Sequence, residues 1–276
     1  MKSVSVTAGP IQYRDVGDPD GPAVVLLHGL LMNDTVWNLV LPLLPEGFRY
    51  LLPVLPMGGH RIPMRDDADL TMPGMVDIVA DFLDALDLTD VTLVVTDWGG
   101  ALFLTDIGRD KRVGKLVICP SEAFENFPPG FPGKVSWVVS RSPATVSLAM
   151  RQLRIGWLRR QWFMFGLMAK KPVPQEIADD WLASGLSDRR IRRDLVKYCQ
   201  TKFVKRDLIR ATDRLADFGG DVLVLWSHNS VMPDTHAQRL AELTSGQLRY
   251  VDDANVLIML DQPAQTARAI GEFLTA

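Results

Sequence analysis

Cysteine is scarce in this chain of 276 residues, occurring only at Cys119 and Cys199. Two cysteines so far apart do not make a disulfide framework, and we expect both to be buried as small apolar side chains. No segment approaches the run of about 18 apolar residues typical of a membrane-spanning helix. The N-terminal residues M-K-S-V-S-V-T lack the apolar core of a secretion signal. These absences predict a cytoplasmic protein with no membrane partner.

A large excess of charge is also absent, since the formal net charge is −3 and the pI is about 5.8. This balance argues against nucleic acid as a partner. The charge is uneven, because residues 121–212 hold 17 basic and 8 acidic residues, a net of +9, whereas the rest of the chain has a net of −12. The pattern predicts a basic insertion seated on an acidic core. A solvated helical face explains most of these charges without any partner.

Motifs for phosphate or metal binding are missing too. The segment L-P-M-G-G-H at 55–60 contains two glycines, but it lacks the strand, G-x-G-x-x-G and helix arrangement of a dinucleotide site. No cluster of histidine, cysteine and carboxylate residues has metal-ligand spacing. We therefore predict no cofactor.

The residues that are present alternate between buried strands and helices. Two short strands in 2–15 predict an edge hairpin. Apolar runs predict further strands at 23–27, 50–54, 90–96, 115–119, 221–226 and 247–251, and helical spacing predicts helices near 37–44, 71–86, 188–203, 234–243 and 263–274. This alternation is typical of a doubly wound, mostly parallel α/β sheet. It stops at Pro120 and resumes at Asp221.

Residues 91–100, V-T-L-V-V-T-D-W-G-G, carry the most informative pattern. An apolar run ends at Asp97, two glycines follow, and apolar residues then continue at helical spacing. A strand, one polar residue, glycine and a helix place a side chain at the tip of a sharp turn. The free N–H groups of the helix favour negative charge there. A simpler interpretation is a strand–helix junction capped by aspartate.

The residues T-D-W-G-G at 96–100 resemble the nucleophile elbow of the α/β-hydrolase fold, as found in haloalkane dehalogenases and epoxide hydrolases. In those enzymes the aspartate attacks carbon and forms an ester. Val95 stands where the family has a small residue. The run His28-Gly29-Leu30 resembles the family's H-G-x-x loop, in which the histidine braces the loop. The resemblance implies that the backbone amides of Leu30 and Trp98 form an oxyanion hole.

The resemblance also implies the arrangement of the whole chain. We expect an eight-stranded α/β-hydrolase core at 1–120 and 213–276, with a helical cap at 121–212 inserted after the sixth strand. The cap is rich in aromatic residues and methionine, most of which we assign to its core. Some of them are expected to line a pocket for a bulky apolar substrate, with Trp137, Trp162 and Tyr198 as candidates.

Two of the three expected triad residues are missing. The family's histidine would fall at Val256, which we therefore expect to line the pocket, and the run W-S-H-N-S-V-M-P at 226–233 lacks the usual acid. Some dehalogenases place the acid after the sixth strand, where this chain has Glu122, with Glu125 next in line. Glu122 either faces Asp97, in which case one of the two pKa values rises, or caps a helix or loop.

Three hypotheses for function follow. An aspartate ester needs a base to activate water, whereas an aspartate that only moves protons needs no histidine. The first hypothesis is a non-hydrolytic enzyme for cyclisation, isomerisation or elimination of a polyketide- or terpenoid-sized molecule, with Asp97 moving the proton. The second is a hydrolase of an epoxide, halide or ester in which His228 has become the base. The third is a ligand-binding protein without catalysis. The oligomeric state is left open.

Overall fold

The computed structural model describes residues 1–276, and an eight-stranded sheet forms its centre. The strand order is β1-β2-β4-β3-β5-β6-β7-β8. Strands β1, β2 and β4 pair antiparallel, and all other neighbours pair parallel. The strands are Lys2–Val6, Gly9–Gly17, Ala23–Leu26, Arg49–Pro53, Val91–Asp97, Val113–Ser121, Asp221–Trp226 and Gln247–Tyr250. The predicted doubly wound, mostly parallel sheet is confirmed.

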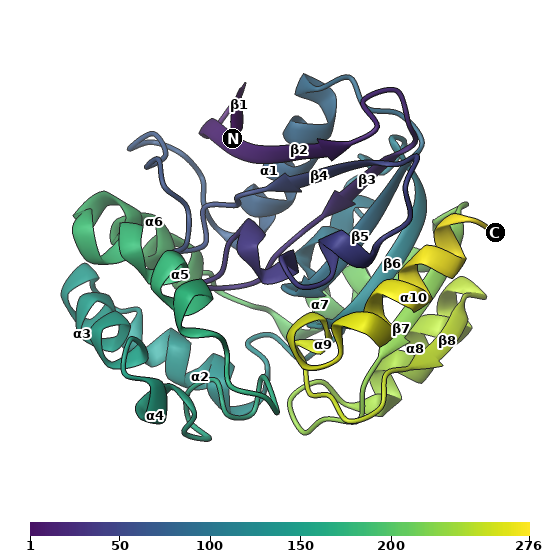
Figure 1. The fold of residues 1–276 in the computed structure, drawn as a ribbon. Helices are drawn as coiled ribbons and strands as arrows, with labels where there is room; N and C mark the ends of the chain where they lie inside the picture. The colour runs from purple at the N-terminus through teal and green to yellow at the C-terminus, as the bar shows by residue number, and fades with distance from the viewer.

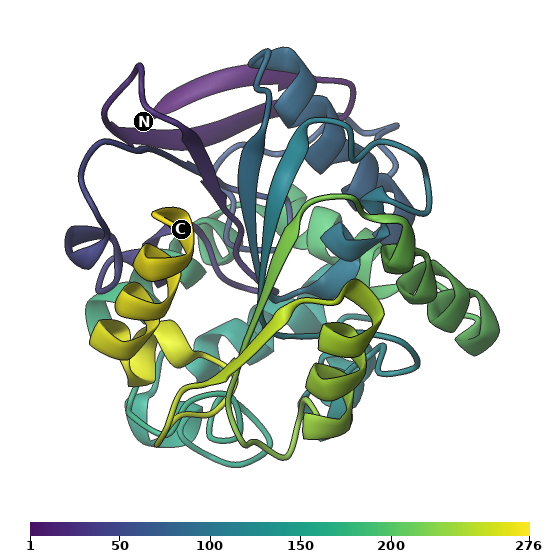
Figure 2. The ribbon, with the colours of Figure 1, turned by 90° about the vertical axis from the view of Figure 1, so that its right-hand side faces the viewer.

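Helices cover both faces of this sheet, with α10 on one side and α1 and α8 on the other (Figure 2). These helices span Met72–Ala85 (α1), Asp234–Thr244 (α8) and Pro263–Leu274 (α10). The short α9, Ile258–Asp261, precedes α10. Helix α1 begins as its sequence indicates, because the Thr71 side chain caps it and Pro73 occupies its first turn.

Two predicted helices differ from expectation. The segment near Trp37 forms two short 3₁₀ helices, Asp34–Trp37 (η1) and Leu41–Leu43 (η2), since Pro42 and Pro45 leave no room for a longer helix. The segment after the elbow is also a 3₁₀ helix, Gly99–Leu104 (η3).

Six helices separate β6 from β7, and α2 to α6 gather on one side of the sheet, at the lower left of Figure 1. They are Gly130–Val139 (α2), Pro143–Leu153 (α3), Gly156–Arg159 (α4), Gln175–Ser187 (α5), Arg189–Cys199 (α6) and Lys205–Asp213 (α7). Helix α7 packs against η3 and against η4, Arg214–Asp217, and the predicted boundary at residue 212 falls within α7.

Polar contacts fasten α5 and α6 to core loops. The Asn33 amide donates to Asp180 Oδ2 at 2.7 Å, and the backbone N–H of Met64 donates to Asp194 Oδ2 at 2.8 Å. Both cysteines are buried and unpaired, Cys119 in β6 and Cys199 at the end of α6. None of the helices combines the length and the apolar character needed to cross a bilayer.

Candidate active site

Asp97 ends the central strand β5 in a sharp turn, with a left-handed φ of 56° that is uncommon outside glycine. Two glycines make this turn possible. A Cβ on Gly29 would overlap the Asp97 carboxylate, and one on Gly99 would overlap the carbonyl oxygen of Glu122. The turn places Asp97 at the carboxyl end of the parallel strands, where ligands of open α/β sheets bind. The predicted elbow is thus present in the structure.

One backbone amide holds the Asp97 carboxylate. The Leu30 N–H donates to Oδ2 at 2.9 Å, and the neighbouring Leu31 has a φ of 62°, which shapes the loop that aims this amide. Asp97 is only 7% exposed. Burial raises the pKa of its carboxyl from 3.8 to about 6, while the hydrogen bond from Leu30 lowers it by less.

The predicted oxyanion hole is not free in this structure. The Leu30 amide is occupied by the Asp97 carboxylate, and the Trp98 amide donates to the carbonyl of Thr96 at 2.6 Å within the turn itself. Both amides are satisfied inside the protein, because the elbow is tight and its own side chain is an anion. A substrate oxygen therefore has to find another donor.

Glu122 supplies a second carboxyl next to Asp97. Its backbone N–H donates to the carbonyl of Asp97 at 3.1 Å, which fixes the end of β6 to the elbow. Burial raises the pKa of Glu122 well above its ordinary 4.5, the Asp97 charge raises it further, and the Gly99 amide opposes this rise. Oε2 of Glu122 is buried without a hydrogen-bond partner. The structure thus brings the two predicted carboxyls together.

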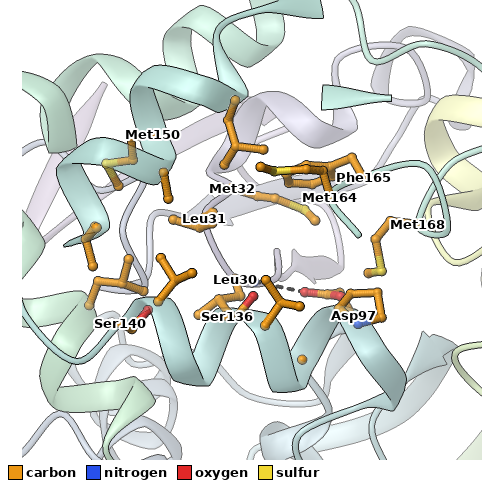
Figure 3. A pocket seen from close by; sticks show the side chains of 18 of the residues that line it. Leu30, Leu31, Met32, Asp97, Ser136, Ser140, Met150, Met164, Phe165 and Met168 are labelled. Carbon is orange, nitrogen blue, oxygen red and sulfur yellow. Dashed lines mark hydrogen bonds between the residues drawn. The ribbon is translucent and has the colours of Figure 1, made fainter. Parts of the chain in front are cut away.

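A cavity of about 140 Å³ opens above these carboxyls, and 16 of its 24 lining residues are hydrophobic. Figure 3 shows Asp97 at one end of the row of side chains, and Ser140 and Met150 at the other. Methionines form much of the wall, and their unbranched side chains adapt to ligands of irregular shape. They are Met32, Met150, Met164 and Met168.

Helix α2 also lines this cavity, which the sequence pattern did not indicate. Pro132, Val135, Ser136 and Val139 repeat at i, i+3, i+4 and i+7, and all four line the cavity. This spacing is visible in the sequence, but a proline and a serine among four positions conceal the apolar stripe. Ser136 and Ser140 give the wall two hydroxyl groups, and Ser140 lies at the end far from Asp97 (Figure 3).

Tyr198 and Trp98 both line the cavity and add polar hydrogens close to the carboxyls. Burial holds the pKa of the Tyr198 hydroxyl well above 10, and the nearby Asp97 charge acts in the same direction, so the hydroxyl remains protonated. The buried indole N–H of Trp98 has no partner of good geometry, although it lies near enough to Tyr198 to lower that pKa slightly.

Two of the four histidines are buried in loops and have partners there. His28 Nδ1 donates to the Gly29 carbonyl at 2.8 Å, and Nε2 accepts from the Leu55 amide at 2.8 Å, so that this ring braces the loop as predicted. Burial lowers the pKa of His28 to about 4, and the ring is neutral. His60 is buried as well, with its Nε2 atom 3.2 Å from Asp194 Oδ2.

The other two histidines also lie outside the cavity. His228 has a side chain that is 66% exposed, contacts Asp234 Oδ2 at 2.5 Å and stacks on Tyr250 with 4.4 Å between the ring centroids. His236 lies on α8 against Phe124. The structure therefore does not bring His228 to Asp97, since its loop turns outward to the last strand.

Val256, at the family's histidine position, is fully buried but does not line the cavity. The cap closes over its loop, because the Leu257 amide donates to the Met168 carbonyl at 2.8 Å. Asp261 strengthens this closure by accepting from the backbone amides of Asn255 and Lys170, both at 2.9 Å. Met168, and not Val256, forms the wall there.

Trp137 and Trp162 do not line the cavity either. Their exposed fractions are 44% and 56%, and both side chains lie on the outside of the cap. We expected the aromatic residues of the cap to lie either in its core or in the pocket. These two lie instead on its outer surface.

His228→Ala tests whether this histidine takes part in catalysis. Because His228 is exposed and makes its contacts with Asp234 and Tyr250, we expect turnover to change less than about twofold, with at most about 1 kcal/mol lost from the free energy of unfolding. Steady-state kinetics and urea denaturation measure the two effects. A loss of turnover by orders of magnitude would instead support the hypothesis of a hydrolase in which His228 is the base.

Comparison with known proteins agrees with this fold and elbow. Residues 24–269 match the model of the alpha/beta hydrolase family, and the chain belongs to that family. Enzymes of the α/β-hydrolase superfamily are among its relatives. The structure is similar to that of a proposed ancestral haloalkane dehalogenase, with a TM-score of 0.78 and 18% identity over 100% of this chain and 98% of the other.

Two curated relatives differ in how much they share with this chain. A haloalkane dehalogenase of Mycolicibacterium paratuberculosis is 32% identical over 160 residues, which cover 54% of this chain and 50% of that protein. The match thus spans about half of that relative. A cis-3-alkyl-4-alkyloxetan-2-one decarboxylase of Xanthomonas campestris is 27% identical over an alignment of 290 positions, which covers 96% of this chain and 92% of that protein.

Proposed function

We propose that this protein is a non-hydrolytic enzyme in which Asp97 acts as a base and Glu122 as an acid on a bulky apolar small molecule. The proposal rests on one observation: two buried carboxyls lie at the end of an apolar cavity, and no histidine lines that cavity. Tuned carboxyls that differ in pKa divide acid and base roles between them.

The absence of an imidazole from the cavity argues against turnover through an ester of Asp97. Such an ester is released only when a base activates water beside it. Both ring nitrogens of His28 have partners in its own loop, His60 contacts Asp194, and His228 contacts Asp234. An ester formed here would persist, whereas proton transfer leaves the enzyme ready for another cycle.

The pKa shifts of the two carboxyls support this division of roles. Asp97, with a pKa of about 6, is mostly ionised at pH 7 and accepts a proton. Burial and the neighbouring Asp97 charge raise the pKa of Glu122 well above 4.5, which favours its protonated form as the donor to a substrate oxygen. Asp97 takes one proton from the substrate and Glu122 gives one to it. The starting state is restored when the proton on Asp97 is transferred to Glu122.

The cavity wall supports an apolar substrate with a small polar centre. Polar hydrogens from Glu122, Tyr198 and the Trp98 indole gather near Asp97, and most of the remaining wall is aliphatic, aromatic or thioether. A cyclisation, isomerisation or elimination of a polyketide- or terpenoid-like molecule suits this distribution.

A second candidate is the decarboxylation of an alkyl-substituted oxetan-2-one. The relative named for that activity matches nearly the whole of this chain, unlike the dehalogenase of M. paratuberculosis. Loss of carbon dioxide from an oxetan-2-one leaves an alkene and consumes no water. Two alkyl chains on a small polar ring also fit an apolar cavity with carboxyls at one end.

The fate of water oxygen tests the proposal. We expect the protein, incubated in ¹⁸O-water with a cis-3,4-dialkyl-oxetan-2-one, to give the alkene and no labelled 3-hydroxy acid. Gas chromatography with mass spectrometry measures both products. A labelled hydroxy acid formed at each turnover would show hydrolysis and contradict the non-hydrolytic proposal.

A single-turnover measurement tests the role of Asp97 separately. After incubation with 1-bromohexane, we expect the mass of the intact protein to be unchanged, because a base forms no bond to carbon. A stoichiometric gain of one hexyl group would identify Asp97 as a nucleophile. Asp97→Asn is the control that distinguishes this adduct from alkylation elsewhere.

A further inference from the structure

Helix α2 has a second face that points away from the cavity. The positions that line the cavity repeat along one side of the helix. A second stripe follows the opposite side and consists of Phe131, Lys134, Trp137, Val138 and Arg141. Arg141 lies just beyond the end of the helix. All five side chains are exposed, including 44% of Phe131 and 50% of Val138. The helix therefore carries apolar residues both toward the cavity and toward the outside.

Trp162 extends this stripe from a neighbouring segment. Its ring lies 4.6 Å from that of Phe131, centroid to centroid, and remains 56% exposed. Phe163, which lines the cavity, stands edge-on to Trp162 at 5.8 Å, so the two rings form the inside and outside of one wall. We call the six residues Phe131, Lys134, Trp137, Val138, Arg141 and Trp162 the outer face of the cap.

The charge around this outer face has one sign. Residues 130–171 contain eight basic residues and no acidic residue. Lys134 and Arg141 form no ion pair with any carboxylate of the chain, in contrast to Arg154 and Lys170, which pair with Asp179 and Asp253. Two free cations therefore stand among exposed aromatic rings.

We propose that the outer face of the cap docks on the surface of an anionic phospholipid bilayer. Tryptophan is suited to the boundary between headgroups and acyl chains, because its ring is apolar and its N–H remains hydrated. Lysine and arginine beside such rings add attraction to anionic lipids. Docking of this kind requires no spanning helix, so the missing apolar run that predicted no membrane partner does not exclude it.

Charge favours a bilayer over a second copy of this chain as the occupant. Two copies meeting through this face would bring Lys134 and Arg141 of each copy together, with no carboxylate from residues 130–171 to compensate. An anionic bilayer neutralises these cations and accepts the rings at the same time.

Vesicle flotation tests the proposal with the intact protein. We expect binding to vesicles of equal parts phosphatidylglycerol and phosphatidylcholine, and weak binding to pure phosphatidylcholine. Lys134→Gln with Arg141→Gln should weaken binding to the anionic vesicles roughly 30-fold, from about 1 kcal/mol for each cation at a membrane surface. Trp137→Ser with Trp162→Ser should weaken binding to them at least about tenfold, because the rings provide the apolar contact.

Matched changes on the core control for loss of charge or apolar surface in general. Lys111→Gln with Arg268→Gln removes two exposed cations that form no ion pair, and Leu39→Ser with Leu43→Ser removes two exposed apolar side chains. We expect both control proteins to bind vesicles as the unaltered protein does. Absence of binding to anionic vesicles, or equal losses in test and control variants, would overturn the proposal. A concentration-dependent dimer that the Trp137 and Trp162 changes abolish would assign the face to a second copy instead.

Discussion

Asp97→Asn is expected to lower turnover by roughly 10³-fold or more, because an amide cannot accept the proton that the proposed base removes. The substitution preserves the size of the side chain, and the Leu30 amide can still donate to its carbonyl oxygen, so ligand binding should change little. Steady-state kinetics together with ligand titration separates the two quantities. Unchanged turnover in this variant would remove Asp97 from the mechanism and favour the hypothesis of a binding protein.

The same variant should be more stable than the unaltered protein above pH 6. A carboxyl whose pKa is raised from 3.8 to about 6 contributes stability that is present below pH 4 and is lost as the pH rises through 6. The loss amounts to about 3 kcal/mol, and asparagine has no charge to bury. Urea denaturation at pH 5 and pH 8 measures roughly half of this loss, about 1.4 kcal/mol, because the other half occurs below pH 5.

Asp221→Asn is the matched control, since Asp221 is exposed at the start of β7 and forms no ion pair. Its free energy of unfolding should stay within about 0.5 kcal/mol of the unaltered protein at both pH values. Equal dependence on pH in the Asp97 variant and the unaltered protein would contradict a raised pKa for Asp97.

Gly99→Ala should have the largest effect on stability, because the new methyl group would overlap the backbone carbonyl of Glu122. A backbone atom cannot rotate away, so β6 and the elbow would have to separate. We expect a loss of at least about 3 kcal/mol in the free energy of unfolding, or failure to fold. Thermal and urea denaturation of the purified protein measure the loss.

Gly219→Ala is the matched control for this change. A Cβ at Gly219 meets no atom within 4 Å, and its backbone is not left-handed. The same substitution there should change stability by no more than about 1 kcal/mol, and any change should be toward greater stability. Similar losses at both glycines would show that the packing of Glu122 against Gly99 is unimportant.

Strands and surface helices could be predicted closely from the sequence because their signals are local. Strand β7 and helix α10 have the predicted bounds, since a continuous apolar run and a proline-initiated amphipathic stretch are each decisive alone. The elbow was found for the same reason: a strand, Asp97 and two glycines are contiguous in the chain.

The details that sequence analysis missed depend on contacts between distant segments. Whether the Leu30 amide is free depends on the rotamer of Asp97, which lies 67 residues away. The outward position of Trp137 depends on which side of α2 faces the cavity. That side is set by residues of other helices that line the same cavity. The pairing of Glu122 with Asp97 was one of two interpretations, because only the register of β5 and β6 brings the two together.

The contact between Leu257 and Met168 limits what a substitution at Val256 can achieve. A histidine placed at Val256 would enter a fully buried position that the cap has closed, so it would need new space before reaching Asp97. Val256→His alone is therefore not expected to give Asp97 a water-activating imidazole. The fit between helical segment and loop keeps a ring out of this position unless neighbouring side chains change with it.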